Sequence, residues 1–254
     1  MEIITQKVEN LPVYIFNTRQ EMGVQAAEDA AKIINEIIAK NGVANIVFAA
    51  APSQNDLLEN LLKQDIDWTK VRGFHQDEYI GIDASEPAGF GNWLRRAIFD
   101  KVPFMELHYL LCSADEADAK CAEYTELLKK YPIDLIFLGI GENGHLAFND
   151  PAVADFNDPK MIKVVELDDV CRQQQVNDGC FPTLNDVPKQ AMSLTMSFIM
   201  SVPYAICVVP TDRKANAVYG ATRGPVTTAC PASILRQHKG AGLYLDKDSA
   251  SKIL

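Results

Sequence analysis

The chain of 254 residues has little of what marks a metal-binding or disulfide-linked protein. It has four histidines, and its six cysteines form neither a CxxC pair nor a spacing typical of zinc ligands. We therefore expect reduced thiols, several of them in the core, and no bound metal.

Long apolar runs and an excess of positive charge are also missing. No run is long enough to span a bilayer, and residues 1–4 do not begin a positive segment followed by an apolar stretch, so we expect a cytoplasmic protein. The 24 Lys and Arg against 34 Asp and Glu give a formal net charge of -10. Because nucleic acids and anionic membranes bind basic surfaces, we expect neither as a partner. A phosphate-binding site would have to be a local cluster of cations.

The sequence also lacks internal repeats, low-complexity tracts and linkers. With 48% hydrophobic residues it can bury a large core, and we predict one domain over 1–254. Strand-like runs alternate with helical ones, which predicts an α/β, Rossmann-like, doubly wound and mostly parallel sheet. Strands are predicted at 46–50, 71–75, 133–138, 205–209 and 242–245, and helices at 20–40, 56–63, 90–99 and 114–130.

Polar stretches follow four of these strands, at 51–54, 76–79, 139–150 and 211–214. Because the carboxyl ends of parallel strands meet at one edge of a sheet, we expect all four stretches to lie there. The stretch 139–150 has three glycines, two amides, two acids and a histidine. Glycines allow close approach of backbone to a ligand, and His145 is the best candidate for moving a proton near neutral pH. This composition is typical of an active site.

Two of these stretches resemble motifs of the glucosamine-6-phosphate deaminase (isomerase) family. Residues 77–79 are Asp-Glu-Tyr, and residues 139–151 are Gly-x-Gly-x-x-Gly-His-x-Ala-Phe-Asn-Asp-Pro, where the family has Gly-x-Gly-x-Asp-Gly-His-Ile-Ala-Phe-Asn-Glu-Pro. The likeness continues through 187–195, 212–215 and 230–238. The related 6-phosphogluconolactonases share the Gly-His core but usually continue with Thr-Ala-Ser and carry Asp-Glu-Arg. The deaminase branch therefore fits better.

The resemblance implies an enzyme that deaminates and isomerises an amino-sugar 6-phosphate without a metal or organic cofactor. The reaction would convert glucosamine 6-phosphate to fructose 6-phosphate and ammonia, or act on the galactosamine epimer. Asp77 would be the base that moves a proton from C2 to C1, and His145 would open the pyranose ring. Taken alone, Asp77 and Glu78 could simply cap a turn, and His145 could simply form hydrogen bonds. The family match favours catalysis.

Two residues near His145 depart from the family pattern. Asn143 replaces the usual Asp, and an amide gives an imidazole no charge with which to stabilise its protonated form. Asp150 replaces the usual Glu that orients the histidine, and its shorter side chain must reach farther. We expect slower ring opening or a different preferred substrate.

The predicted phosphate site departs further from the family pattern. Ala51 and Ser53 belong to Ala-Pro-Ser-Gln where the family has Gly-Gly/Ser-Thr-Pro, although backbone amides and the serine could still bind phosphate. Lys214 matches the family's phosphate-binding lysine. The arginine of the mobile lid is replaced, with Gln175 at its place and Arg172 as a possible substitute, unless these residues are only a solvated helix face. Three further residues complete the predicted substrate-binding set: Glu78, Gly139 and Gly141.

The sequence leaves two alternatives to a deaminase open. One is a hydrolase of the 6-phosphogluconolactonase type, which shares the fold and the Gly-His loop. The other is a sugar-phosphate-binding module that has lost turnover, which Asn143 and the altered stretch 51–54 would favour. The sequence does not choose between the glucosamine and galactosamine substrates, or between a monomer and a homo-oligomer.

Overall fold

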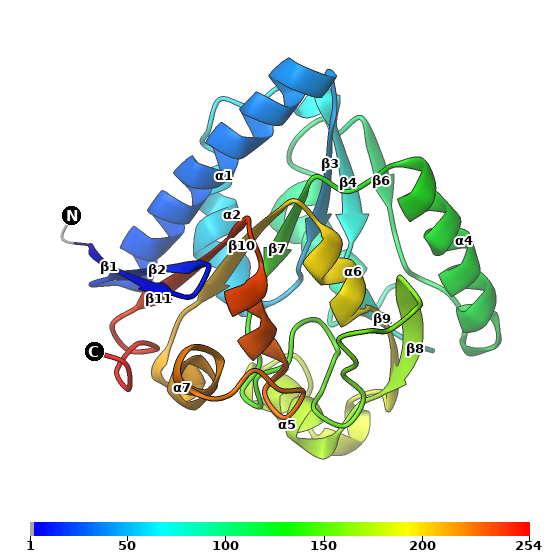
Figure 1. Cartoon of the computed structure of the whole chain (residues 1–254). Coiled ribbons are helices and arrows are strands. Elements are labelled where there is room, and N and C mark those ends of the chain that lie inside the picture. The colour runs from blue at the N-terminus through cyan, green and yellow to red at the C-terminus, as the bar shows by residue number, and fades with distance from the viewer. Residues whose placement is uncertain (1–2) are drawn as a thin grey trace.

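The core of the molecule is an eight-stranded β-sheet flanked by helices, seen in a computed structural model that describes residues 3–254 (Figure 1). Met1 and Glu2, with which the predicted domain begins, lie outside the described residues. The strand order is β1-β2-β11-β10-β7-β3-β4-β6, and every neighbouring pair is parallel except the β1–β2 hairpin. The strands are β1 (Ile4–Val8), β2 (Leu11–Phe16), β3 (Ala44–Phe48), β4 (Val71–His75), β6 (Glu106–His108), β7 (Leu135–Leu138), β10 (Tyr204–Val209) and β11 (Ala241–Asp246).

Helices cover both faces of this sheet, which confirms the doubly wound α/β fold. Alternate residues of a strand point to opposite faces, so Ile46 and Phe48 join one hydrophobic cluster while Val47 joins the other. The first cluster contains side chains of α1 (Arg19–Asn41), α2 (Asn55–Leu61) and α3 (Phe90–Leu94), and the second contains those of α4 (Ala117–Lys130), α6 (Met196–Ser201) and α7 (Ala215–Arg223).

The longest helix, α1, has clear signals at both ends. Thr18 precedes it, and its hydroxyl accepts a hydrogen bond from the backbone N–H of Glu21 at 3.2 Å, which satisfies one free donor of the first turn. Gly42 ends the helix with φ of 81°, a left-handed conformation that glycine adopts without strain. These signals lie next to the predicted span 20–40, and the observed helix is one residue longer at each end.

A second, three-stranded sheet was not predicted. It consists of β5 (Asp77–Tyr79), β9 (Gln190–Leu194) and β8 (Ile162–Glu166), in that order and all antiparallel. The stretch 76–79 was expected only as a polar segment after a strand, but Asp77–Tyr79 form a strand of their own, because the chain leaves β4 and pairs almost at once with β9. A three-residue strand carries too little hydrophobic alternation to be detected in sequence.

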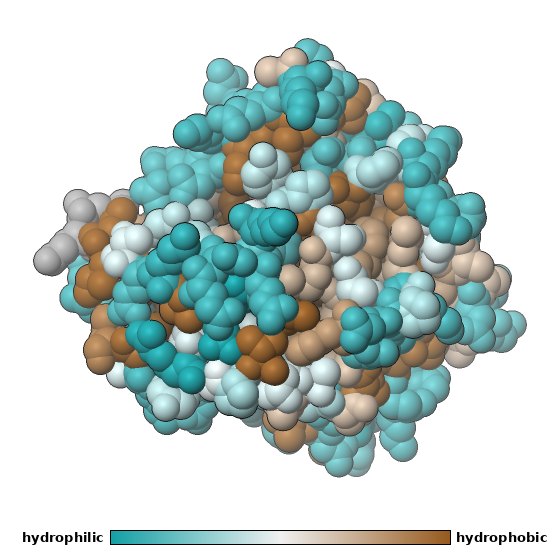
Figure 2. All heavy atoms as spheres, in the orientation of Figure 1, coloured by the Kyte–Doolittle hydropathy of each residue, from teal (hydrophilic) through white to brown (hydrophobic). Residues whose placement is uncertain are grey.

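The carboxyl ends of β3, β4, β7 and β10 lie at the same edge of the large sheet, as expected from their parallel pairing. Residues 51–54, 76–79, 139–150 and 211–214 therefore come together although they are far apart in sequence. No helix among residues 3–254 is both long enough and apolar enough to cross a bilayer. On the face shown in Figure 2, polar residues cover most of the surface and apolar ones show between the helices.

Candidate active site

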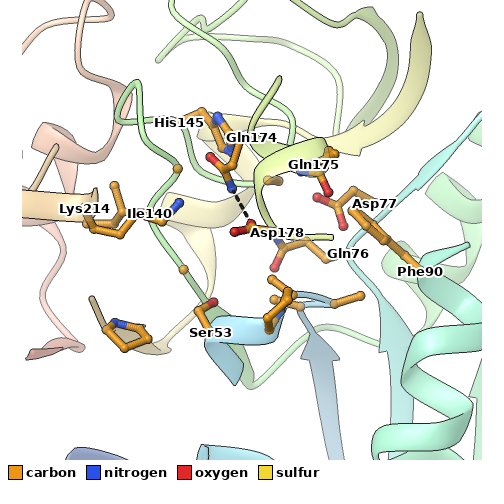
Figure 3. A pocket seen from close by; sticks show the side chains of 18 of the residues that line it. Ser53, Gln76, Asp77, Phe90, Ile140, His145, Gln174, Gln175, Asp178 and Lys214 are labelled. Carbon is orange, nitrogen blue, oxygen red and sulfur yellow. Dashed lines mark hydrogen bonds between the residues drawn. The ribbon is translucent and has the colours of Figure 1, made fainter. Parts of the chain in front are cut away.

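A cavity lies at this edge of the large sheet (Figure 3). All four strand-following stretches contribute to its wall, together with the start of α1 and the end of α5 (Asp169–Asn177). Its main polar lining residues are Arg19, Ser53, Gln76, Asp77, His145, Gln174, Gln175, Asp178, Thr211, Arg213 and Lys214. The predicted residues Ala51, Gly139 and Gly141 also line it. The sequence stretches thus form one site.

Asp77 is the buried acid of this cavity. It begins β5, lies 5% exposed and lines the wall close to Gln76 and Phe90. Burial and the neighbouring charge of Glu78 raise the pKa of its carboxyl well above the usual value. A carboxylate with a raised pKa is a stronger base, as removal of a proton from carbon requires.

Glu78 does not line the cavity, which corrects its expected role in substrate binding. Successive residues of a strand point in opposite directions, so the side chain beside Asp77 faces the interior. The Glu78 carboxylate accepts hydrogen bonds from the backbone N–H groups of Tyr79, Phe90 and Gly91 at 2.9, 3.0 and 2.8 Å. Burial raises the pKa of Glu78, and these three donors counteract that rise in part. Glu78 therefore anchors the start of α3 to β5.

His145 is held by two neighbours through its Nδ1 atom. Nδ1 lies 2.7 Å from the Asn143 side-chain oxygen and 2.9 Å from the Asp150 carboxylate. Both neighbours are acceptors, so Nδ1 carries the proton and the neutral ring leaves Nε2 as an acceptor. Asp150 thus reaches the histidine directly, in spite of its shorter side chain.

The orientation of Asn143 follows from its four hydrogen bonds. Its oxygen accepts from the backbone N–H of His145 at 3.0 Å as well as from the ring. Its amide nitrogen donates to Asp150 at 3.0 Å and to Asp168 at 3.3 Å. Rotating the amide would set its oxygen against two carboxylates. Asn143 therefore joins the histidine to two acids, which a carboxylate at 143 could not do.

The loop geometry around His145 requires glycine at two positions. A Cβ atom on Gly141 would lie 2.1 Å from the His145 ring, so only glycine lets the ring lie against this backbone. Gly144 has φ of 87°, and a Cβ there would lie 2.7 Å from the sulfur of Cys230. The two glycines fix where the imidazole can lie.

Asp150 is ionised more readily than an ordinary aspartate. Burial raises the pKa of its carboxyl, but hydrogen bonds from His145, Asn143 and the backbone of Asp168 outweigh that effect and lower it. The Sγ of Cys171 lies close by: it, a ring nitrogen of His145 and an Asp150 oxygen all lie within 4.8 Å of one another. Among residues 3–254, these three buried side chains form the one group of donors close enough to hold a metal ion.

Ser53 and Lys214 lie on the side of the cavity away from Asp77 (Figure 3). A Cβ on Gly139 would lie 3.1 Å from the Ser53 hydroxyl, so this glycine lets the serine approach β7 closely. Lys214 ends a short 3₁₀ turn that follows β10 and is 7% exposed. Burial lowers the pKa of its amine, while the charges of Asp178 and Glu142 oppose that shift.

The backbone before Lys214 is strained. Thr211 has φ of 80°, which a β-branched residue rarely adopts. Its N–H donates to both carboxylate oxygens of Asp246, at 3.0 and 3.2 Å, which holds the residue in this conformation. Strain that the surroundings maintain in this way is typical of functional sites, and here it directs the turn that carries Lys214 into the cavity.

Gln175, at the place of the lid arginine, and Arg172, its possible substitute, differ in position. Gln175 lines the cavity, but Arg172 does not, so the structure does not support Arg172 as a phosphate ligand. The Arg172 guanidinium donates to the backbone oxygens of Leu184 and Val187 and pairs with Asp169. These contacts fix α5 to the segment that follows it.

Several lining residues were not identified from the sequence, chiefly Arg19, Gln174, Asp178 and Arg213. Arg19 follows β2, and because β2 pairs in parallel with β11, its carboxyl end lies at the same edge as the others. Because β2 was not predicted, Arg19 was not expected at this edge of the sheet. Arg213 directly precedes Lys214 in the sequence and could have been identified from it. Asp178, by contrast, is brought to the site only by the packing of α5.

Comparisons with known proteins agree with this geometry. The family described as glucosamine-6-phosphate isomerases/6-phosphogluconolactonase matches residues 17–244. A glucosamine-6-phosphate deaminase of Listeria welshimeri is 33% identical over 231 residues, which cover 91% of this chain and 97% of that protein. The deaminase of Enterococcus faecalis is 31% identical over 237 residues, or 92% and 100% of the two chains. This chain therefore belongs to the glucosamine-6-phosphate isomerase/6-phosphogluconolactonase family, which confirms the resemblance seen in sequence.

Solved structures agree in fold. A monomeric glucosamine-6-phosphate deaminase superposes with a TM-score of 0.85 at 25% identity, covering 94% of this chain and 99% of that one. A 6-phosphogluconolactonase from Shewanella baltica has a TM-score of 0.75 at 18% identity, covering 96% and 100%. The second likeness shows the fold alone.

Proposed function

We propose that this protein deaminates and isomerises an amino-sugar 6-phosphate, converting glucosamine 6-phosphate and water to fructose 6-phosphate and ammonia. The observation that carries the proposal is that Asp77, His145 and Lys214, which follow three different strands, line one cavity. A base, a ring-opening group and a cation for phosphate are the three parts that this reaction needs. The names of the relatives support the same chemistry.

Ring opening is the role of His145. The carbonyl at C1 must be exposed before the hydrogen at C2 becomes acidic, so the C1 hydroxyl loses a proton and the ring oxygen gains one. The free Nε2 of His145 can take up and return that proton, because Nδ1 keeps its own proton between Asn143 and Asp150. The negative charge of Asp150 stabilises the imidazolium that forms.

Proton transfer between carbons is the role of Asp77. Its carboxylate removes the C2 proton from the open-chain aldehyde, and the electron pair moves onto the C1 oxygen, which takes a proton from water to give an enol with the amine still on C2. Protonation at C1 by the same carboxyl gives an iminium ion at C2, and loss of a proton from its nitrogen to water leaves an imine. Water adds to this imine and ammonia leaves, which gives the ketone. Because water replaces the amine, the overall reaction is formally a hydrolysis.

Phosphate recognition is the role of Lys214 together with Ser53 and the backbone of Ala51. The chain as a whole carries a net charge of -10, so a buried cation in the cavity must supply the attraction. A cation that contacts phosphate forms charge-assisted hydrogen bonds, which are stronger than neutral ones.

The test is a comparison of three substrates with the purified protein. Glucosamine 6-phosphate, its galactosamine epimer and 6-phosphogluconolactone are offered separately, and ammonia, ketose phosphate and free acid are measured. Equal amounts of ammonia and fructose 6-phosphate from the first substrate are expected. Hydrolysis of the lactone without ammonia release from either amino sugar would contradict the proposal. Saturable binding of glucosamine 6-phosphate with turnover of none of the three substrates would indicate a binding module.

A further inference from the structure

The cavity contains a carboxylate on the side where a phosphate is expected. Asp178 directly follows α5 and lines the cavity with Ser53 and Lys214. In Figure 3 the carboxylate of Asp178 lies toward the middle of the cavity, with the end of Lys214 on one side of it and Asp77 on the other. An acid in this position repels the substrate group that Lys214 would attract.

Asp178 is held there by two partners. Arg213 pairs with its Oδ1 atom at 3.1 Å, and the Gln174 amide lies 3.5 Å from Oδ2. The Asp178 side chain is 14% exposed and that of Arg213 is 46% exposed. Arg213 also donates to the backbone oxygen of Asn177 at 3.2 Å, so both of its contacts go to the end of α5.

The charge balance of the cavity wall favours an exchange of anions. Arg19 pairs with Asp56 at 2.5 Å, and Arg213 pairs with Asp178, so two of the three lining cations already have a carboxylate partner. A phosphate that enters beside Lys214 therefore meets Asp178 as well. Displacement of this carboxylate would free the Arg213 guanidinium, whose planar array of donors suits phosphate.

We propose that Asp178 is an internal competitor for the phosphate group, and that the incoming phosphate takes its place between Arg213 and Lys214. Arg213 then serves as a second phosphate-binding cation, in place of the lid arginine that this chain lacks at Gln175. The inference rests on the proposed function, because it takes Lys214 to bind phosphate.

The exchange would also affect α5. In the present arrangement the Arg213 contacts fix the end of this helix to the turn that carries Lys214. Gln174 in the same helix accepts a hydrogen bond from the backbone N–H of Glu142 at 2.9 Å, in the loop of His145. Release of Asp178 would therefore remove one of the two contacts that Arg213 makes with the end of α5, while the bonds to Asn177 and Gln174 remain.

The test measures affinity for phosphate with and without the competing charge. Asp178→Asn is expected to lower both the KM for glucosamine 6-phosphate and the inhibition constant of inorganic phosphate by roughly threefold to tenfold, the effect of one partly screened charge. Arg213→Gln is expected to raise both constants. Asp178→Glu keeps the charge and should leave the constants close to those of the wild type.

A matched control removes one negative charge elsewhere. Glu126 lies exposed on α4 and outside the cavity lining, so Glu126→Gln tests whether a change of net charge alone alters affinity. Unchanged or raised constants in Asp178→Asn, or an equal fall in Glu126→Gln, would overturn the inference. Titration of inorganic phosphate into the unreacted protein gives a second measure that does not depend on turnover.

Failure of the inference can be told apart from failure of the proposed function. If Lys214→Ala weakens the binding of glucosamine 6-phosphate and Asp178→Asn does not strengthen it, phosphate binds as proposed and Asp178 does not compete. If the wild type releases no ammonia but Asp178→Asn binds inorganic phosphate more tightly, the competition is supported and the proposed reaction is wrong. Thermal melting of each variant establishes that the protein is folded.

Discussion

The two halves of the cavity are built differently. Around His145, Asn143 and Asp150 form a closed set of hydrogen bonds in which the ring, the amide and the carboxylate each have fixed partners. Around Lys214, the side chains are charged and one of the neighbours is an acid of the same sign as the expected ligand. Under the proposed function, the proton-transfer half is arranged in advance, whereas the proposed exchange at Asp178 requires the phosphate half to rearrange when its ligand binds.

This difference follows from what each half does. Proton transfer needs atoms held at hydrogen-bond distance before the substrate arrives, because each misplaced group slows the reaction. Binding of an anion can tolerate an exchange of partners, because the free energy of binding is the sum over several contacts and does not depend on one fixed arrangement. Substitutions in the first half should therefore lower kcat, and those in the second should change KM.

The largest expected effect is in the proton-transfer half. Asp77→Asn removes the base but keeps nearly the same shape, so we expect ammonia release to fall by about 10²-fold to 10⁴-fold while the melting temperature changes little. Exchange of the C2 hydrogen of the substrate with solvent, followed by NMR, reports the step directly. Exchange at the wild-type rate would remove Asp77 from the role of base.

The next largest effect is in the phosphate half. Lys214→Ala removes a charge-assisted contact worth about 1.5–3 kcal/mol, so the KM for the phosphorylated sugar should rise roughly tenfold to a hundredfold. Lys214→Arg, which keeps the charge, should have a smaller effect. An unchanged KM in Lys214→Ala would mean that the phosphate binds elsewhere in the cavity.

A smaller effect is expected at Asn143, where a substitution adds a negative charge to the half of the cavity around His145. Asn143→Asp would place a carboxylate beside His145, which should raise the apparent pKa of ring opening and move the acid side of the pH-rate profile, where the neutral imidazole is lost, to higher pH. It would also face Asp150 and Asp168, now 3.0 and 3.3 Å from the amide nitrogen, and like charges at such distances destabilise the fold.

Adding Asp168→Asn to this variant should restore part of the lost stability, because one of the two repulsions is removed. An amide at 168 can still accept the helix-capping hydrogen bond from the N–H of Cys171 that the Asp168 carboxylate now accepts at 2.7 Å. A pH-rate profile that Asn143→Asp leaves unchanged would show that position 143 does not couple to the histidine. The departure from the family motif would then be better explained by a different preferred sugar phosphate.

The smallest effect concerns stability in acid. The pKa of Asp150 is lowered below its ordinary value of 3.8, so its ionised form stabilises the folded state at any pH above that value. This contribution is lost as the pH falls through the lowered pKa. Urea unfolding of Asp150→Asn should therefore show a smaller loss of stability than the wild type as the pH falls below 3.8. If the free energy of unfolding falls equally with pH in the two proteins, the lowered pKa of Asp150 does not contribute to stability as described.

Much of the fold could be predicted from the sequence where the signal is local. The strand at 71–75 was predicted with its observed bounds, and the alternation of apolar runs with amphipathic helices was enough for the parallel sheet. The position of the four polar stretches at one edge of the sheet followed from that parallel arrangement. The strands β1, β2, β5, β6, β8 and β9 were missed: β5 and β6 have only three residues, and β1, β5, β8 and β9 pair antiparallel with their neighbours.

The site was harder to predict for a different reason. The sequence indicates which residue types follow a strand, but not which way a side chain points, so Glu78 was assigned to the cavity although it faces the interior. Arg172 was named as a possible phosphate ligand, although backbone carbonyls already accept its hydrogen bonds. Asp178 is close to Lys214 only through the packing of α5, which no local pattern reports.

The central claim, that Asp77 carries a proton between C2 and C1, has one direct measurement. Glucosamine 6-phosphate with deuterium at C2 is converted in D₂O, and the fructose 6-phosphate formed is examined by NMR. A single base acting from one side predicts one deuterium at C1, in one of the two stereochemically distinct positions, whether or not the base exchanges with solvent, together with one ammonia per ketose. Equal deuterium in both positions at C1, or labelled product formed by Asp77→Asn at the wild-type rate, would contradict the account.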